Sequence, residues 1–107
     1  MILKFAYSPK VKKYIYADIV DGINNTVVVF SSGFSGSKNM PFIKTMANKF
    51  NKKGFVTVRI NFCNDSNDKV KQHDAYEIQD MNFSLYNIGL KNLMNSLKNK
   101  YKNIILL

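Results

Sequence analysis

The chain has little that could cross-link it, because Cys63 is the one cysteine among 107 residues and no internal disulfide can form. Zinc sites built from several cysteines of this chain are excluded for the same reason. No apolar run approaches the roughly 18 residues that a membrane-spanning helix needs. The opening residues MILKFAYSPK lack the long apolar stretch and cleavage site of a secretory signal. These features predict a cytoplasmic protein with a reduced thiol and no membrane span.

Acidic residues and arginine are also scarce. Lys and Arg total 16 against seven Asp and Glu, for a formal net charge of +9, yet Arg59 is the one arginine. A basic balance suggests nucleic acid or an anionic membrane as a partner. The lysines, however, stand mostly singly or in pairs, and specific readers of phosphates and bases favour arginine. We therefore interpret the charge as a generic solvated surface and keep a basic nucleic-acid-binding module as the less favoured alternative.

Apolar patterns alternate between strand and helix along a chain whose length and 46% apolar composition fit one domain, residues 1–107. The segment TVVVF at 26–30 is typical of a strand covered on both faces, and Pro41 suits the first turn of a helix. We expect strands at 3–7, 14–20, 26–30, 55–62 and 103–107, helices at 41–52 and about 81–101, and a polar loop at 63–80. This order predicts an α/β fold, a mainly parallel sheet with an antiparallel start.

Details of the two helices can also be predicted. Their buried faces would include Phe42 in the first helix and Phe83 in the second, from the three- and four-residue spacing of apolar side chains. Asp80 is the expected N-cap of the second helix. Gly89 either weakens that helix or lets it approach the sheet closely.

The segment TVVVFSSGFSGSKNMPFIKTMANKFNKKGFVTVRINF resembles the amino-terminal half of the α/β-hydrolase fold, especially its small esterase and peptidase-like members. Ser32-Gly33-Phe34 stands where that family has a His-Gly-aromatic turn, and residues 61–66 stand where it has a later Gly-rich loop. The resemblance covers about residues 26–107. It implies a partial α/β-hydrolase-like sheet of two leading strands followed by β-α-β-α-β.

The resemblance also implies what chemistry the chain carries. In this family the nucleophile elbow Gly-x-Ser-x-Gly directly follows the strand matched here by IILL, and the acid and the histidine come later. The chain therefore has no matched catalytic residue, and we expect an amino-terminal fragment of a serine hydrolase that is inactive alone. One oxyanion-hole donor would be the backbone N–H of Phe34, with Gly33 allowing the turn.

Other residues that could carry chemistry have simpler structural explanations. His73, the one imidazole, could pair with Ser66 or Cys63, but it falls in the polar loop and not in a late position. Cys63 would need a helix N-terminus or a cation to lower its thiol pKa. The carboxylates between residues 65 and 80 lack the spacing of a calcium loop, and the Gly33–Gly36 stretch lacks that of a Walker A motif. We expect no metal, no cofactor and no catalytic side chain.

The residues NIILL at 103–107 would form an edge strand. Native edges are usually blunted by charge, by proline or by a covering element, and this segment has none of these. We therefore expect a completing polypeptide or self-association through Asn103–Leu107, or else a truncated relic of low stability. This unprotected edge leads to a second interpretation of the chain, as a non-catalytic interaction protein that pairs through its open sheet edge.

Overall fold

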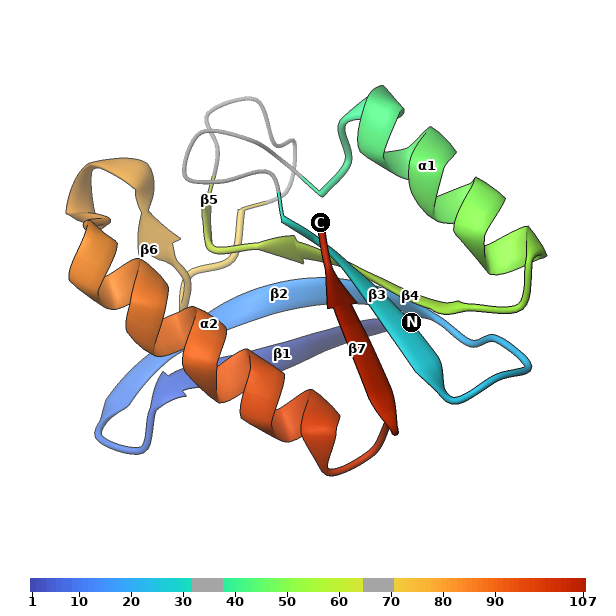
Figure 1. Ribbon diagram of the computed structural model, residues 1–107. Coiled ribbons are helices and arrows are strands. Elements are labelled where there is room, and N and C mark those ends of the chain that lie inside the picture. Colours follow the sequence, from blue (N-terminus) through green and yellow to red (C-terminus); the bar gives the residue numbers. More distant parts are fainter. Residues whose placement is uncertain (32–37, 65–70) are drawn as a thin grey trace.

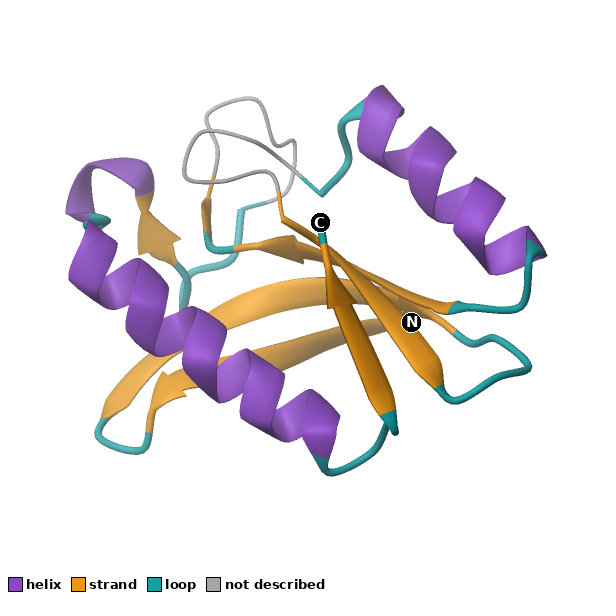
Figure 2. Ribbon diagram, viewed as in Figure 1, coloured by secondary structure: helices purple, strands orange, loops and turns teal. Residues whose placement is uncertain are grey.

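The computed structural model describes residues 1–31, 38–64 and 71–107, and these form one mixed five-stranded sheet with a helix on each face (Figures 1 and 2). The order across the sheet is β1-β2-β4-β3-β7. The strands are β1 (Ile2–Ser8), β2 (Val11–Val20), β3 (Thr26–Ser31), β4 (Val56–Asn61) and β7 (Asn103–Leu106). The helices are α1 (Pro41–Lys52) and α2 (Phe83–Lys98).

The expected α/β content is confirmed, but the sheet is mixed and not mainly parallel. Strand β3 pairs in parallel with β4 and β7, whereas β2 pairs antiparallel with both β1 and β4. The reason is the position of the β1–β2 hairpin, whose second strand joins the outer side of β4 and so adds a second antiparallel ladder. The prediction that the NIILL segment lies next to TVVVF as a strand is confirmed, because β7 and β3 pair from Thr26↔Asn103 to Val29↔Leu106.

Strand β3 lies inside the sheet, between β4 and β7, as its unbroken apolar sequence predicts. Val27 and Val29 belong to the core under α2, while Val28 and Phe30 belong to the core under α1. Successive side chains of a strand point to opposite faces, so both faces of β3 must be covered. Figure 1 shows the result, with α2 crossing β1 and β2 on one side of the sheet and α1 standing over β3 and β4 on the other.

Helix α1 has the predicted bounds. Gly54 follows it with a φ of +100°, a conformation that an L side chain rarely adopts and that is common just after a helix end. Ile43 and Ala47 form its buried face. Phe42 is 70% exposed, so its assignment to that face was wrong. It lies in the first helical turn, where its direction from the helix axis is about 100° away from that of the buried Ile43.

Helix α2 starts later than predicted and has a different cap. The side chain of Asn82, not Asp80, accepts a hydrogen bond from the N–H of Leu85 at 2.9 Å. Asp80 instead ends a short 3₁₀ helix, η1 (Ile78–Asp80), after which the chain is extended. Phe83, expected on the buried face, is 79% exposed because it occupies the first helical position, before the helix reaches the sheet.

Gly89 lets α2 approach the sheet closely, as one of the two predictions for it stated. A β-carbon built there would meet Tyr7 Cε1 at 2.5 Å and Ile15 Cδ1 at 2.9 Å. Both of these side chains are almost fully buried. The helix therefore depends on the missing side chain to sit on the β1–β2 hairpin.

The polar segment after β4 is more ordered than a plain loop. Strands β5 (Cys63–Asn64) and β6 (Tyr76–Glu77) pair in parallel, and the Asn64 side chain donates to the carbonyl of Gln72 at 2.7 Å. The prediction of a polar loop throughout 63–80 was therefore wrong for these residues. Two-residue strands leave no periodic signal in a sequence. Within the described ranges, no helix is both long and apolar enough to cross a membrane.

Candidate functional site

The carboxyl ends of β3 and β7 lie side by side at one edge of the sheet. The N–H of Leu107 donates to the carbonyl of Val29 at 2.9 Å, and the N–H of Ser31 donates to the carbonyl of Leu107 at 3.2 Å. Parallel strands end at the same edge, and ligands of α/β sheets usually bind outside the carboxyl ends of the strands. A ligand site is therefore expected at this edge of the sheet.

Ser31 is the last residue of β3 and brings a hydroxyl to that edge. Its Oγ lies 3.3 Å from the phenol oxygen of Tyr86, whose ring packs against Phe62 with 4.4 Å between the centroids. This neighbour is a phenol and not the imidazole that activates a catalytic serine. Gly33 and Phe34, the predicted oxyanion-hole turn, lie outside the described residues.

Cys63 is buried in β5, with 4% of its surface exposed. Its strand neighbour in β6 is Tyr76, and neither of the α-helices that the structure describes begins at the thiol. Nearby, burial is the main cause that raises the pKa of the Tyr7 phenol, which donates to the carbonyl of Phe62 and contacts the sulfur of Met81. The surroundings of Cys63 are those of a core residue, which a substrate would not reach.

His73 and Asp74 are adjacent in sequence but do not form a catalytic pair. His73 is exposed, while the carboxylate of Asp74 accepts from the Tyr16 hydroxyl at 2.5 Å and from Lys4 Nζ at 3.2 Å. The hydrogen bond from Tyr16 lowers the pKa of Asp74, and desolvation followed by this same bond raises the pKa of Tyr16 to about 12. Asp74 therefore ties the turn before β6 to the β1–β2 hairpin.

The other carboxylates between residues 65 and 80, which were weighed above as calcium ligands, do not come together as a cation site in the described residues. Glu77 accepts a hydrogen bond from the Asn64 side chain at 3.2 Å, and Asp80 is exposed in η1. Asp65 and Asp68 lie outside the described residues. In the ranges that the structure describes, no three His, Cys, Asp or Glu side chains come together as metal ligands.

An ionic cluster that the sequence did not reveal lies on the α1 face of the sheet. Asp18 Oδ2 is 2.7 Å from Lys38 Nζ and 3.1 Å from Arg59 Nη2, and all three side chains are at most 15% exposed. Arg59 Nη1 also donates to the Lys38 carbonyl at 2.5 Å. Asp18 and Arg59 are direct partners across β2 and β4. Opposite charges on two strands would have suggested this pair only if the antiparallel β2–β4 register had been known.

The outer side of β7 is an open apolar edge. Ile105, Leu106 and Leu107 are 40–50% exposed, and no described strand pairs with that side. Asn103 and Leu107 direct their N–H groups to β3. Backbone groups of alternate residues point to opposite sides of a strand, so those of Ile104 and Leu106 point away from β3. The edge therefore offers hydrogen-bonding groups and apolar side chains to another strand.

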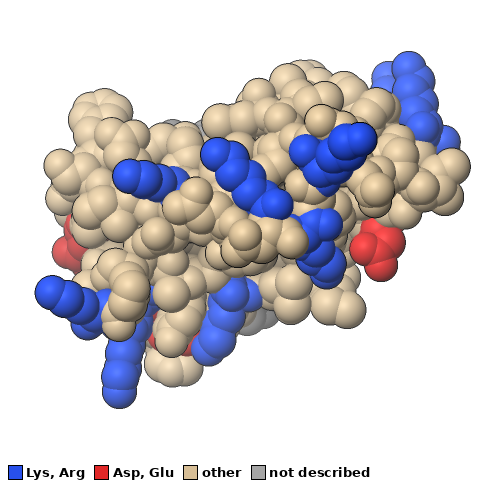
Figure 3. All heavy atoms as spheres, turned by 60° about the horizontal axis from the view of Figure 1, so that its bottom comes forward, with Lys and Arg blue, Asp and Glu red and all other residues tan. Residues whose placement is uncertain are grey.

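The basic side chains do not gather over a groove on the face that Figure 3 shows. They stand over the surface with uncharged area between most of them. This distribution agrees with the interpretation of a solvated basic surface better than with a continuous phosphate-binding stripe.

No protein-family model matches the chain, and no curated protein matches it significantly.

Proposed function

We propose that this domain is the amino-terminal half of the sheet of a serine hydrolase of the α/β-hydrolase type, which in its complete form hydrolyses an ester or amide. The observation that carries the proposal is the parallel pairing of β3 and β7, whose carboxyl ends share one edge of the sheet. The strand-turn-helix order from β3 through α1 to β4 supports it, as do the motifs quoted above from the sequence.

The chemistry of such an enzyme needs two segments at that edge. A serine on a sharp turn after one strand attacks the carbonyl carbon, and an acyl-enzyme forms and is hydrolysed by water. The oxyanion is held by the backbone N–H of the residue after the serine and by one from the turn that follows β3. In this chain we assign the second donor to Phe34, with Gly33 allowing the turn. The serine would come from polypeptide that follows or joins β7.

By itself, the chain is expected to be inactive. The described residues that could have formed a substitute site do not form one: Cys63 is buried, and His73 is exposed and does not pair with Asp74. Without a nucleophile, no tetrahedral intermediate of acyl transfer forms for the one remaining oxyanion-hole donor to stabilise, so we expect little acceleration.

The experiment starts from the DNA that follows codon 107. We expect it to encode Gly-x-Ser-x-Gly directly after the β7 strand, in frame or after a frameshift. A protein extended through that motif and the following frame should react with a fluorophosphonate probe, and the Ser→Ala variant of the motif should not. The 107-residue chain is the matched control and should neither react nor hydrolyse a p-nitrophenyl ester.

Two results would overturn the proposal. One is a downstream sequence without the motif in any frame. The other is robust ester turnover by the 107-residue chain that Cys63→Ala abolishes, which would make the buried thiol the nucleophile.

The open β7 edge favours a second candidate, a non-catalytic protein that pairs through this strand with a partner or with a second copy. Its exposed apolar residues lack the charges and prolines that protect natural edges. Size-exclusion chromatography with light scattering separates the two candidates. Self-association of the 107-residue chain supports the second, whereas a clean monomer that captures no partner counts against it.

A further inference from the structure

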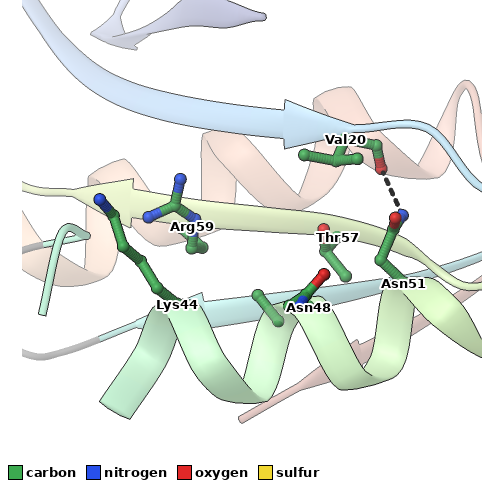
Figure 4. A pocket seen from close by; sticks show the side chains of 7 residues that line it. Val20, Lys44, Asn48, Asn51, Thr57 and Arg59 are labelled. Atoms are coloured by element: carbon green, nitrogen blue, oxygen red, sulfur yellow. Dashed lines mark hydrogen bonds between the residues drawn. The ribbon is translucent and has the colours of Figure 1, made fainter. Parts of the chain in front are cut away.

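A pocket of about 160 Å³ opens between α1 and the strands beside it, away from the β3–β7 edge (Figure 4). Helix α1 packs mainly on β4 and β3, and the pocket lies along its side that faces Val20 of β2. Seven residues line this pocket: Val20, Lys44, Ala47, Asn48, Asn51, Thr57 and Arg59. Figure 4 shows Lys44 and Asn48 rising from the helix toward the strand that carries Thr57 and Arg59.

The pocket has an excess of positive charge. Arg59 is fixed in place, because its Nη1 donates to the Lys38 carbonyl and its Nη2 to Asp18. The same carboxylate oxygen also receives Lys38 Nζ, so one negative charge serves two cations. Lys44 adds a third cation and forms no ion pair with any described residue. An anion in the pocket would therefore meet charge that the protein itself leaves unbalanced.

Neutral polar groups complete the lining. The Asn51 side chain donates to the carbonyls of Asp21 at 2.8 Å and Phe55 at 3.1 Å, which holds one end of the pocket in shape. Asn48 and Thr57 place an amide and a hydroxyl between that end and the cations of Lys44 and Arg59. Arginine and lysine beside amide and hydroxyl donors are the groups that bind the several oxygens of a phosphate.

We propose that this pocket binds the phosphate group of a small molecule. Its volume is below the 300–1,000 Å³ or so that is usual for drug-sized ligands, which favours a small anion over an extended one. Lys44 supplies a mobile point charge, and the immobilised guanidinium of Arg59 supplies directed donors. The pocket is separate from the β7 edge, so the result of a phosphate-binding test leaves the hydrolase proposal unchanged.

The test is a titration of the 107-residue protein with inorganic phosphate, followed by amide chemical shifts at constant ionic strength. Saturable shifts are expected at Ala47, Asn48 and Thr57. Lys44→Gln should weaken binding roughly tenfold, the effect of losing one partly solvated charge-assisted contact. Lys49→Gln is the matched control, because it removes the same charge from the same helix outside the pocket. Acetate should bind much more weakly than phosphate.

A second variant keeps the test decisive if Lys44→Gln disturbs the fold, so that its phosphate affinity cannot be compared with that of the unmodified protein. Asn48→Asp introduces a carboxylate at an exposed helix position that lines the pocket, and it should abolish the saturable shifts. The proposal is overturned if phosphate causes no saturable shifts, if the shifts spread over the lysine-bearing surface, or if Lys44→Gln and Lys49→Gln weaken binding equally. Acetate binding as tight as that of phosphate would also overturn it.

Discussion

Replacing Gly89 by alanine tests the packing of α2 on the β1–β2 hairpin, because two effects of known size oppose each other there. In an exposed helix, Gly→Ala stabilises by about 1 kcal/mol. At this position the new β-carbon would stand 2.5 Å and 2.7 Å from two ring carbons of Tyr7, and 2.9 Å from Ile15 Cδ1. Real β-carbons essentially never approach other atoms this closely, so either the ring or the helix must move.

The surroundings of Tyr7 oppose such a movement. Its hydroxyl donates to the Phe62 carbonyl, its ring packs edge-on against Tyr76 at 5.0 Å, and its carbonyl accepts from the Asn92 side chain of α2. Overpacking of a core usually costs about 1–3 kcal/mol, and a held ring favours the upper end. After subtraction of the helix gain, Gly89→Ala should lower the free energy of unfolding by about 2 kcal/mol. This corresponds to a Tm roughly 10 °C lower for a domain of this size.

Urea and thermal unfolding followed by circular dichroism measure this change, and an unchanged m-value shows that the same surface unfolds. The control is Asn95→Ala, at an exposed position of the same helix, which should gain about 0.5 kcal/mol from helix propensity alone. A Gly89→Ala protein that is stabilised as much as the control would refute the close contact between α2 and the hairpin.

Three further predictions follow from the same contacts. Asp18→Asn should lower the free energy of unfolding by about 2 kcal/mol in urea titrations, because it leaves two largely buried cations without their carboxylate. The pKa of Tyr16 is raised from 10.0 to about 12, so its contribution to stability is complete below pH 10 and is lost as the pH rises toward 12. The variant Tyr16→Phe should therefore show a smaller fall of Tm between pH 10 and pH 12. An alkaline profile of Tm that the substitution leaves unchanged would contradict the Tyr16–Asp74 hydrogen bond. Leu106→Lys should convert any associated form of the protein to a monomer in size-exclusion chromatography, and association that survives the substitution would exclude the β7 edge as the contact.

The sequence predicted best where one segment alone carries the physical signal. The bounds of α1 follow from Pro41 and from apolar spacing, and β3 follows from a run that is apolar or β-branched at every residue. The exposed positions of Phe42 and Phe83 were missed because periodicity indicates a helix face but not where the sheet beneath it ends. The cap of α2 was misplaced because Asp80 and Asn82 are both good caps, and the choice depends on the backbone between them.

The sequence by itself determined the alternation of strands and helices and the double-sided burial of β3, but it left the role of Gly89 open. The tertiary structure decided the antiparallel junction of β2 with β4, and with it the Asp18–Lys38–Arg59 cluster and the pocket beside α1. The physical reason is that these features depend on the pairing of strands far apart in the sequence; in the ionic cluster, Asp18 lies 20 positions from Lys38 and 41 from Arg59. Local patterns specify which face of a strand is apolar, whereas the pairing of distant strands specifies which charges meet.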